Sequence, residues 1–109
     1  MLKNTLEKYL QDFDVIITTG GTGVSKKDIT IETISPMLEK RVPGIMEMVR
    51  IKYGEQNPNA LLSRSIAGTI GNTLIFCLPG SPKAVREYMT EIFTVLEHMI
   101  IMTYGFDNH

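Results

Sequence analysis

The stretch VIITTGGTG at residues 15–23, followed by DIT at residues 28–30, decides the fold of this chain. Its first five residues form an apolar, β-branched run bounded by glycines, which predicts a buried strand of a parallel sheet. Gly20, Gly21 and Gly23 then end the strand and let the backbone come close to a bound molecule. The stretch therefore predicts a strand, a tight loop and a following helix.

The glycine loop also suggests a binding site. Successive backbone N–H groups in such a turn can form an anion-binding nest, to which Thr22 adds a hydroxyl group. The carboxylate of Asp28, just downstream, could hold a magnesium ion against a phosphate bound on the loop. Lys26 and Lys27 could approach the same phosphate or be ordinary exposed lysines. The alternative interpretation of the whole stretch is a strand-to-helix turn without a ligand.

A second strand is expected at residues 74–78, LIFCL, which is apolar on both faces and therefore central in the sheet. Gly71-Asn72 before it predicts a hairpin with a strand at residues 65–69. The strand ends at Pro79-Gly80-Ser81-Pro82, where Ser81 suits a helix N-cap. If the strands at 15–19 and 74–78 run parallel, both turns lie at the carboxyl edge of the sheet, where α/β proteins bind ligands. This arrangement predicts a phosphate-bearing ligand.

Apolar residues at helical spacing predict four helices around these strands. They cover residues 2–11, residues 30 to about 41, a segment that begins at Pro43-Gly44, and residues 82 to about 102. Pro36 falls inside the second helix and predicts a kink or a late start at Ser35. In the third helix, Glu47 and Arg50 form an i,i+3 pair that is expected to be a surface ion pair.

The composition is that of one ordinary globular domain covering residues 1–109, with 43% hydrophobic and 21% charged residues. A net charge of −1 gives no electrostatic reason to expect nucleic acid or an anionic membrane as a partner. The single cysteine, Cys77, cannot form an internal disulfide, and the first residues do not form a signal peptide. A cytoplasmic location is expected. Serine, histidine and aspartate do not form a nucleophilic arrangement, which argues against covalent catalysis.

Six motifs follow one another along nearly the whole chain. They are TTGGTG at 18–23, D-x-T-x-E at 28–32, PG at 43–44, LSR at 62–64, AG at 67–68 and LPGSPKAV at 78–85. Together they resemble the molybdopterin adenylyltransferases of molybdenum cofactor biosynthesis, the MoaB/MogA group with the gephyrin G domain. The resemblance implies a three-layer α/β/α fold with a mostly parallel sheet and a C-terminal β-hairpin.

The resemblance also implies a reaction, in which AMP is transferred from Mg-ATP to molybdopterin and pyrophosphate is released. Mapped onto this chain, Gly20, Gly21, Thr22 and Gly23 would hold the nucleotide phosphates. Asp28 matches an acidic residue that is associated with Mg²⁺ and with activity. Two further elements, Ser63 and the Gly80-Ser81 turn, would line the pocket for the pterin and its phosphate, with Glu47 and Arg50 at its rim.

Members of the family open with a further strand–helix–strand part, which is expected to be absent here. That part carries a nucleotide-binding stretch and a second aspartate, so the alternative function is a non-catalytic remnant that binds pterin or forms oligomers. A homo-oligomer, a trimer or a hexamer, is expected from the resemblance. Three strands with three or four helices would also bury little core on their own.

Overall fold

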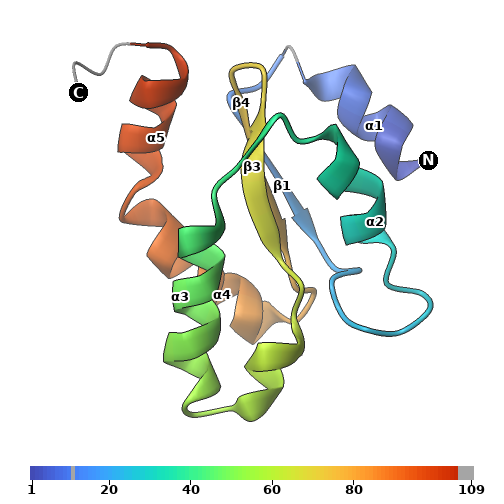
Figure 1. The fold of residues 1–109 in the computed structure, drawn as a ribbon, viewed down its shortest axis with the longest axis vertical. Coiled ribbons are helices and arrows are strands. Elements are labelled where there is room, and N and C mark those ends of the chain that lie inside the picture. The colour runs from blue at the N-terminus through green and yellow to red at the C-terminus, as the bar shows by residue number, and fades with distance from the viewer. Residues whose placement is uncertain (11, 106–109) are drawn as a thin grey trace.

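The structure, a computed structural model, describes residues 1–10 and 12–105. These residues form one four-stranded sheet in the order β1-β4-β3-β2 (Figure 1). The strands are β1 (Val15–Thr19), β2 (Lys40–Arg41), β3 (Ile66–Ile70) and β4 (Thr73–Leu78). β1 pairs with β4 in parallel, whereas β3 is antiparallel to both of its neighbours, β4 and β2.

Helices cover both faces of the sheet (Figure 1). The α-helices are α1 (Leu2–Tyr9), α2 (Thr30–Ile34), α3 (Pro43–Gly54), α4 (Pro82–Phe93) and α5 (Leu96–Thr103), and the 3₁₀ helices are η1 (Ser35–Met37) and η2 (Pro58–Leu62). α1 and α2 lie on one side of the sheet, and α3, α4 and α5 lie on the other. The mixed α/β class and its three layers are therefore as predicted.

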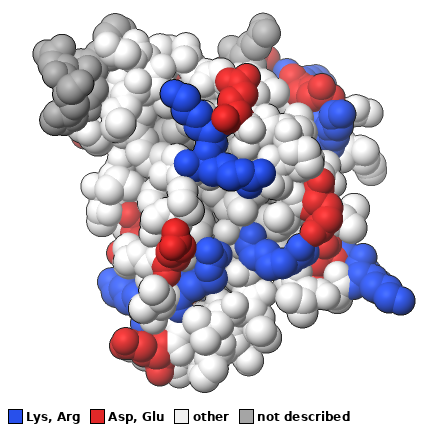
Figure 2. All heavy atoms as spheres, in the orientation of Figure 1, with Lys and Arg blue, Asp and Glu red and all other residues white. Residues whose placement is uncertain are grey.

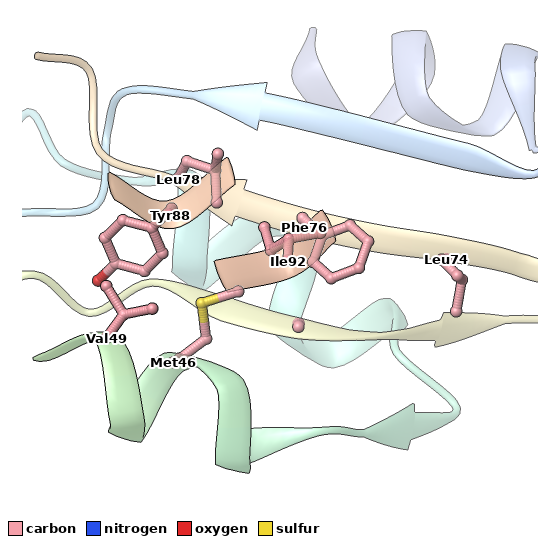
Figure 3. Close-up of a cluster of buried hydrophobic side chains, with 8 residues drawn as sticks. Met46, Val49, Leu74, Phe76, Leu78, Tyr88 and Ile92 are labelled. Carbon is pink, nitrogen blue, oxygen red and sulfur yellow. The ribbon is translucent and has the colours of Figure 1, made fainter. Parts of the chain in front are cut away.

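β4 is the centre of the core, because all six of its residues are buried. Alternate side chains of a strand point to opposite faces. Leu74, Phe76 and Leu78 pack against α3 and α4 in the cluster drawn in Figure 3. Ile75 and Cys77 point the other way and pack against α1 and α2. The apolar character of LIFCL on both faces follows from this central position.

The thiol of Cys77 is completely buried, and this burial raises its pKa. A buried thiol with a raised pKa forms little thiolate, the form that reacts, so Cys77 is expected to be inert.

Three details of the sheet differ from the prediction. One of its three strand pairs is parallel, so the sheet is mixed and not mostly parallel. Among the described residues, β1 pairs only with β4 and forms one edge of the sheet, which leaves Ile17 39% exposed where a buried strand was expected. β2 adds a short fourth strand at the other edge.

Three of the predicted helices also differ from the structure. The helix expected from residue 30 to about 41 ends at Ile34, passes through η1 at Pro36, and gives way to β2. The helix expected from residue 82 to about 102 is interrupted between α4 and α5. α1 ends at Tyr9, and Gln11, the last residue of that predicted helix, lies outside the described residues.

The surface carries charges of both signs. On the face shown in Figure 2, lysine and arginine side chains lie beside aspartate and glutamate, and neither sign dominates. Within the described residues, no helix combines the length and the apolar character needed to cross a membrane.

Candidate functional site

The two glycine turns predicted to meet do so at the carboxyl edge of β1 and β4. Thr19 is paired with Leu78 at the ends of the two strands, and the Gly20 N–H donates to Leu78 O at 2.8 Å. Beyond the sheet the two backbones stay in contact. A Cβ atom placed on Gly80 would lie 3.3 Å from Gly20 Cα. The parallel pairing of distant segments therefore builds one loop cluster.

The first turn is shaped by two successive glycines with positive φ, 96° at Gly20 and 73° at Gly21. Residues other than glycine rarely adopt such angles. Thr30, the first residue of α2, closes the turn: its hydroxyl donates to Gly20 O at 2.9 Å and its N–H to Gly21 O at 3.1 Å. A Cβ on Gly21 would lie 2.1 Å from Thr30 Oγ1, so this position has no space for a side chain.

Thr22 faces inward. It is 3% exposed, and its hydroxyl lies 3.4 Å from Ser63 Oγ, which is 2.7 Å from Ser65 Oγ. This row of hydroxyl groups joins the glycine loop to the segment before β3. The Thr22 hydroxyl thus helps to hold the loop, and Thr22 also lines the pocket between the two glycine turns.

Asp28 lies over the glycine loop, where its Oδ2 accepts a hydrogen bond from the Ser25 N–H at 2.9 Å. The same N–H is the main cause of a lowered Asp28 pKa, with smaller contributions from the Ser25 side chain, the Gly23 N–H and Arg64. The carboxylate is therefore ionised at neutral pH. It does not cap α2, whose N-cap residue is Ile29.

An open pocket of about 320 Å³ lies between the two turns. It is lined by seven of the eight predicted site residues: Gly20, Gly21, Thr22, Gly23, Asp28, Ser63 and Gly80. The eighth, Ser81, caps α4 by accepting a hydrogen bond from the Ala84 N–H at 3.2 Å, and it lines a neighbouring hollow. The structure thus brings seven of the predicted residues together in one pocket. Ser81, which follows Gly80 in the second turn, lies outside that pocket.

Arg64 is a site residue that the sequence analysis did not identify. Its Nε donates to Gly23 O at 2.7 Å and its Nη2 donates to Asp28 O at 3.0 Å, while its backbone N–H donates to Thr22 O. The guanidinium group also binds both carboxylate oxygens of Glu32. Arg64 therefore fastens the glycine loop and the Asp28 backbone together. The opposite charges within the D-x-T-x-E and LSR motifs were the available signal.

The predicted pair of Glu47 and Arg50 does not form. No ion pair joins the two in the described part of the chain, and the Arg50 guanidinium instead donates to Ser63 O at 3.3 Å and Ser65 O at 3.0 Å. Arg50 supports the segment that carries Ser63, whereas Glu47 is exposed on α3. The Arg50 side chain thus pairs with backbone carbonyl groups that are distant in the sequence, and not with Glu47 on the same helix.

The contact between Arg64 and Glu32 predicts a pH dependence of stability. The hydrogen bond from Arg64 is the main reason that the Glu32 pKa is lowered. A lowered pKa in the folded state contributes stability above the unfolded pKa of about 4.3, and this stability is lost as the pH falls through the folded value. We expect the Tm of the wild type to fall more steeply below about pH 4 than that of Glu32→Gln.

This expectation is checked by thermal melts between neutral and acidic pH. The matched control is Glu7→Gln, which removes an exposed carboxylate from α1. Parallel curves for the wild type and Glu32→Gln would contradict the assigned role of the Arg64–Glu32 contact.

The chain is similar to known proteins along most of its length. Residues 1–98 match the family model described as "Probable molybdopterin binding domain". A molybdenum cofactor biosynthesis protein B from Staphylococcus carnosus (strain TM300) is 46% identical over 99 residues, covering 87% of this chain and 58% of that protein. The chain belongs to the MoaB/MogA family of molybdenum cofactor biosynthesis proteins.

Solved structures of MoaB/MogA proteins superpose on most of this chain. The molybdopterin biosynthesis enzyme MoaB of Thermus thermophilus has a TM-score of 0.87 at 39% identity, covering 96% of this chain and 67% of that one. The molybdopterin biosynthesis Mog protein of Mycobacterium ulcerans has a TM-score of 0.90 at 34% identity, covering 95% of this chain and 69% of that one.

The chain is shorter than its MoaB/MogA relatives. It spans 58% of the S. carnosus protein and 59% of its counterpart from Staphylococcus aureus (strain Mu50 / ATCC 700699), which is also 46% identical over 99 residues. Membership of the family therefore covers the fold, and the activity of the longer relatives is a proposal for this chain.

Proposed function

We propose that the chain works as a molybdopterin adenylyltransferase domain, in which AMP passes from Mg-ATP to molybdopterin and pyrophosphate is released. The observation that carries the proposal is the single pocket formed by both glycine turns, with the Asp28 carboxylate at its edge. One wall offers backbone donors and the other offers Ser63 and Gly80, so two phosphorylated molecules could meet there.

The glycine loop supplies hydrogen-bond donors for phosphate. Among the described residues, the N–H groups of Gly21 and Thr22 donate to no protein acceptor. Backbone donors that are fixed before binding stabilise developing negative charge without reorganising. On the opposite wall, α4 begins directly after Gly80-Ser81, and the N-terminus of a helix favours anions. The two turns thus favour phosphate from opposite sides.

Asp28 fits a role as a magnesium ligand. Mg²⁺ is commonly held by one or two carboxylates together with substrate phosphates, so one ionised aspartate beside the phosphate loop is a suitable donor. The described residues contain no cluster of three or more metal-binding side chains, and such a cluster is not required for this mode of binding. A bound Mg²⁺ would neutralise phosphate charge, while Arg64 would keep the Asp28 backbone in position.

The proposal is tested by incubating the chain with Mg-ATP and molybdopterin and measuring pyrophosphate. Release that depends on molybdopterin supports the adenylyltransferase. Binding of molybdopterin without release of pyrophosphate would instead support the alternative, a non-catalytic pterin-binding domain.

The expected homo-oligomer, a trimer or a hexamer, is also a proposal. The exposed apolar side chains of Ile51 on α3 and Phe93 on α4 support it.

Gly80→Ala is expected to weaken pterin binding more than nucleotide binding. A glycine in a tight turn suggests a positive φ that alanine would not tolerate. The φ of Gly80 is not positive, so the expected effect has another cause. The added methyl group would lie 3.3 Å from Gly20 Cα, so the two turns must separate by a few tenths of an ångström. Titration calorimetry with both ligands measures the effect. Equal loss of both ligands together with unfolding would mean that Gly80 is only structural.

A further inference from the structure

The end of the sheet opposite the glycine turns carries two hollows that differ in charge. Both are bordered by the turn between β3 and β4, at Gly71-Asn72. Figure 1 shows this turn at the upper end of the sheet, with α5 on one side and α1 on the other. Neither hollow shares a described lining residue with the pocket between the glycine turns. The two hollows therefore need an explanation of their own.

The first of them, the acidic hollow, has a volume of about 660 Å³. It is lined by the carboxylates of Asp12, Asp14 and Glu39, with no basic side chain among the described lining residues. Asp14 accepts a hydrogen bond from the Tyr104 hydroxyl but forms no ion pair within the described part of the chain. Phe13 lines the same hollow and is 55% exposed. The acidic hollow thus offers negative charge beside an exposed aromatic side chain.

The second, the basic hollow, has a volume of about 520 Å³ and is lined by Lys40 and Arg41 of β2. The Glu39 carboxylate also lines it, but that group accepts a hydrogen bond from the Gly71 N–H at 2.9 Å. Lys40 is exposed and forms no ion pair with any described residue. Met102 of α5 lines this hollow and is 54% exposed. The basic hollow thus offers positive charge beside an exposed methionine.

The two hollows complement each other in a second copy of the chain. Opposite charges across an interface fix its register, and methionine sulfur makes favourable contacts with aromatic rings. Because both hollows border one turn, a two-fold axis near that turn would place each hollow opposite the unlike hollow of the other copy. The same charge pair then forms twice. A net charge of −1 per chain opposes this association only weakly.

We propose that two copies of the chain associate through this end of the sheet, with the acidic hollow of each against the basic hollow of the other. Asp14 then faces Lys40 of the partner subunit, and Phe13 packs on Met102 of the partner subunit. The contact leaves the glycine turns open, because they lie at the other end of β4, so it does not depend on the proposed reaction. A two-fold contact alone gives a dimer, and combined with a three-fold contact it gives a hexamer.

The test is sedimentation velocity of the wild type and of two charge reversals, Lys40→Glu and Asp14→Lys. Each reversal brings like charges together twice across the two-fold axis, so we expect self-association to weaken by about tenfold or more. High salt should also weaken association of the wild type. Lys3→Glu is the matched control, because it reverses an exposed lysine on α1 that lines neither hollow, and it should associate like the wild type.

An equimolar mixture of the two reversals separates a contact between molecules from one within a molecule. In the mixed dimer the new carboxylate faces the new ammonium group, and the second pair is the original one, so association should return. Melting curves show whether each variant is folded. A variant that unfolds is replaced by Lys40→Gln or Asp14→Asn, which should weaken association less than the reversal.

Three results would overturn the inference. The first is a wild type that stays monomeric at its highest soluble concentration. The second is an oligomer whose association is unchanged in folded variants of Lys40 and Asp14, which would place its interface elsewhere. The third is loss of association in both reversals without recovery in their mixture, because the two charges would then not face each other.

Discussion

Replacing Asp28 by Asn is expected to lower the rate of adenylyl transfer by a factor on the order of 10²–10³, the usual effect of removing one electrostatic contact in a transition state. Asn retains the size of the side chain and an oxygen that can accept the hydrogen bond from the Ser25 N–H. The variant should therefore stay folded. It loses the ionised carboxylate that we assign to Mg²⁺.

Single-turnover kinetics and a melting curve for the same variant separate catalysis from folding. Asp12→Asn is the matched control, because it removes an exposed carboxylate at the opposite end of β1. The control should react like the wild type. An unchanged rate in Asp28→Asn, with the same dependence on Mg²⁺ concentration, would reject the metal role.

Gly21→Ala is expected to cause the largest loss of stability among single glycine substitutions in the first turn. A left-handed backbone costs a non-glycine residue about 1–2 kcal/mol. The new methyl group must in addition displace Thr30 Oγ1, which would lie 2.1 Å from it. A loss of this size lowers the Tm of a small domain by about 10 °C. Phosphate binding on the loop should be lost with it.

Gly20→Ala provides the matched control, because its φ is also positive but a Cβ there would have no atom within 4 Å. It should show the backbone strain without the steric clash, and so a smaller fall in Tm. The double variant Gly21→Ala/Thr30→Ala should recover part of the loss, because the obstructing hydroxyl is removed. Equal Tm values for the two alanine variants would contradict the assigned clash.

The two glycine turns could be predicted because their signals are local. The apolar runs before Gly20 and before Pro79 indicate strands, and the glycines and Ser81 indicate the turns. Only the parallel pairing of β1 with β4 was needed to bring the turns together, and the structure confirms it. The roles of these residues in binding remain predictions.

Features that depend on distant residues could not be predicted from local patterns. Lys40 and Arg41 continue a helical pattern, yet they pair with Thr69 and Gly68 because β3 offers an open edge. Arg64 likewise reaches Gly23, 41 residues away in the sequence. No pattern within one segment reports such a partner.

The interruption between α4 and α5 is a different case. Apolar residues keep their helical spacing across it, so periodicity cannot reveal a break. In the structure, the Thr94 hydroxyl donates to Glu91 O at 2.6 Å and the backbone of Val95 leaves helical angles, with φ at −125°. Two β-branched residues in succession were the only local sign.

The burial of Cys77 makes this chain suitable for site-specific labelling. It is the only cysteine in the sequence, and it is 0% exposed with a raised pKa. A maleimide dye should therefore leave the wild type unmodified. Lys26→Cys would place one reactive thiol on the exposed part of the glycine loop, so the fluorescence of a single attached dye would test whether that loop binds phosphate.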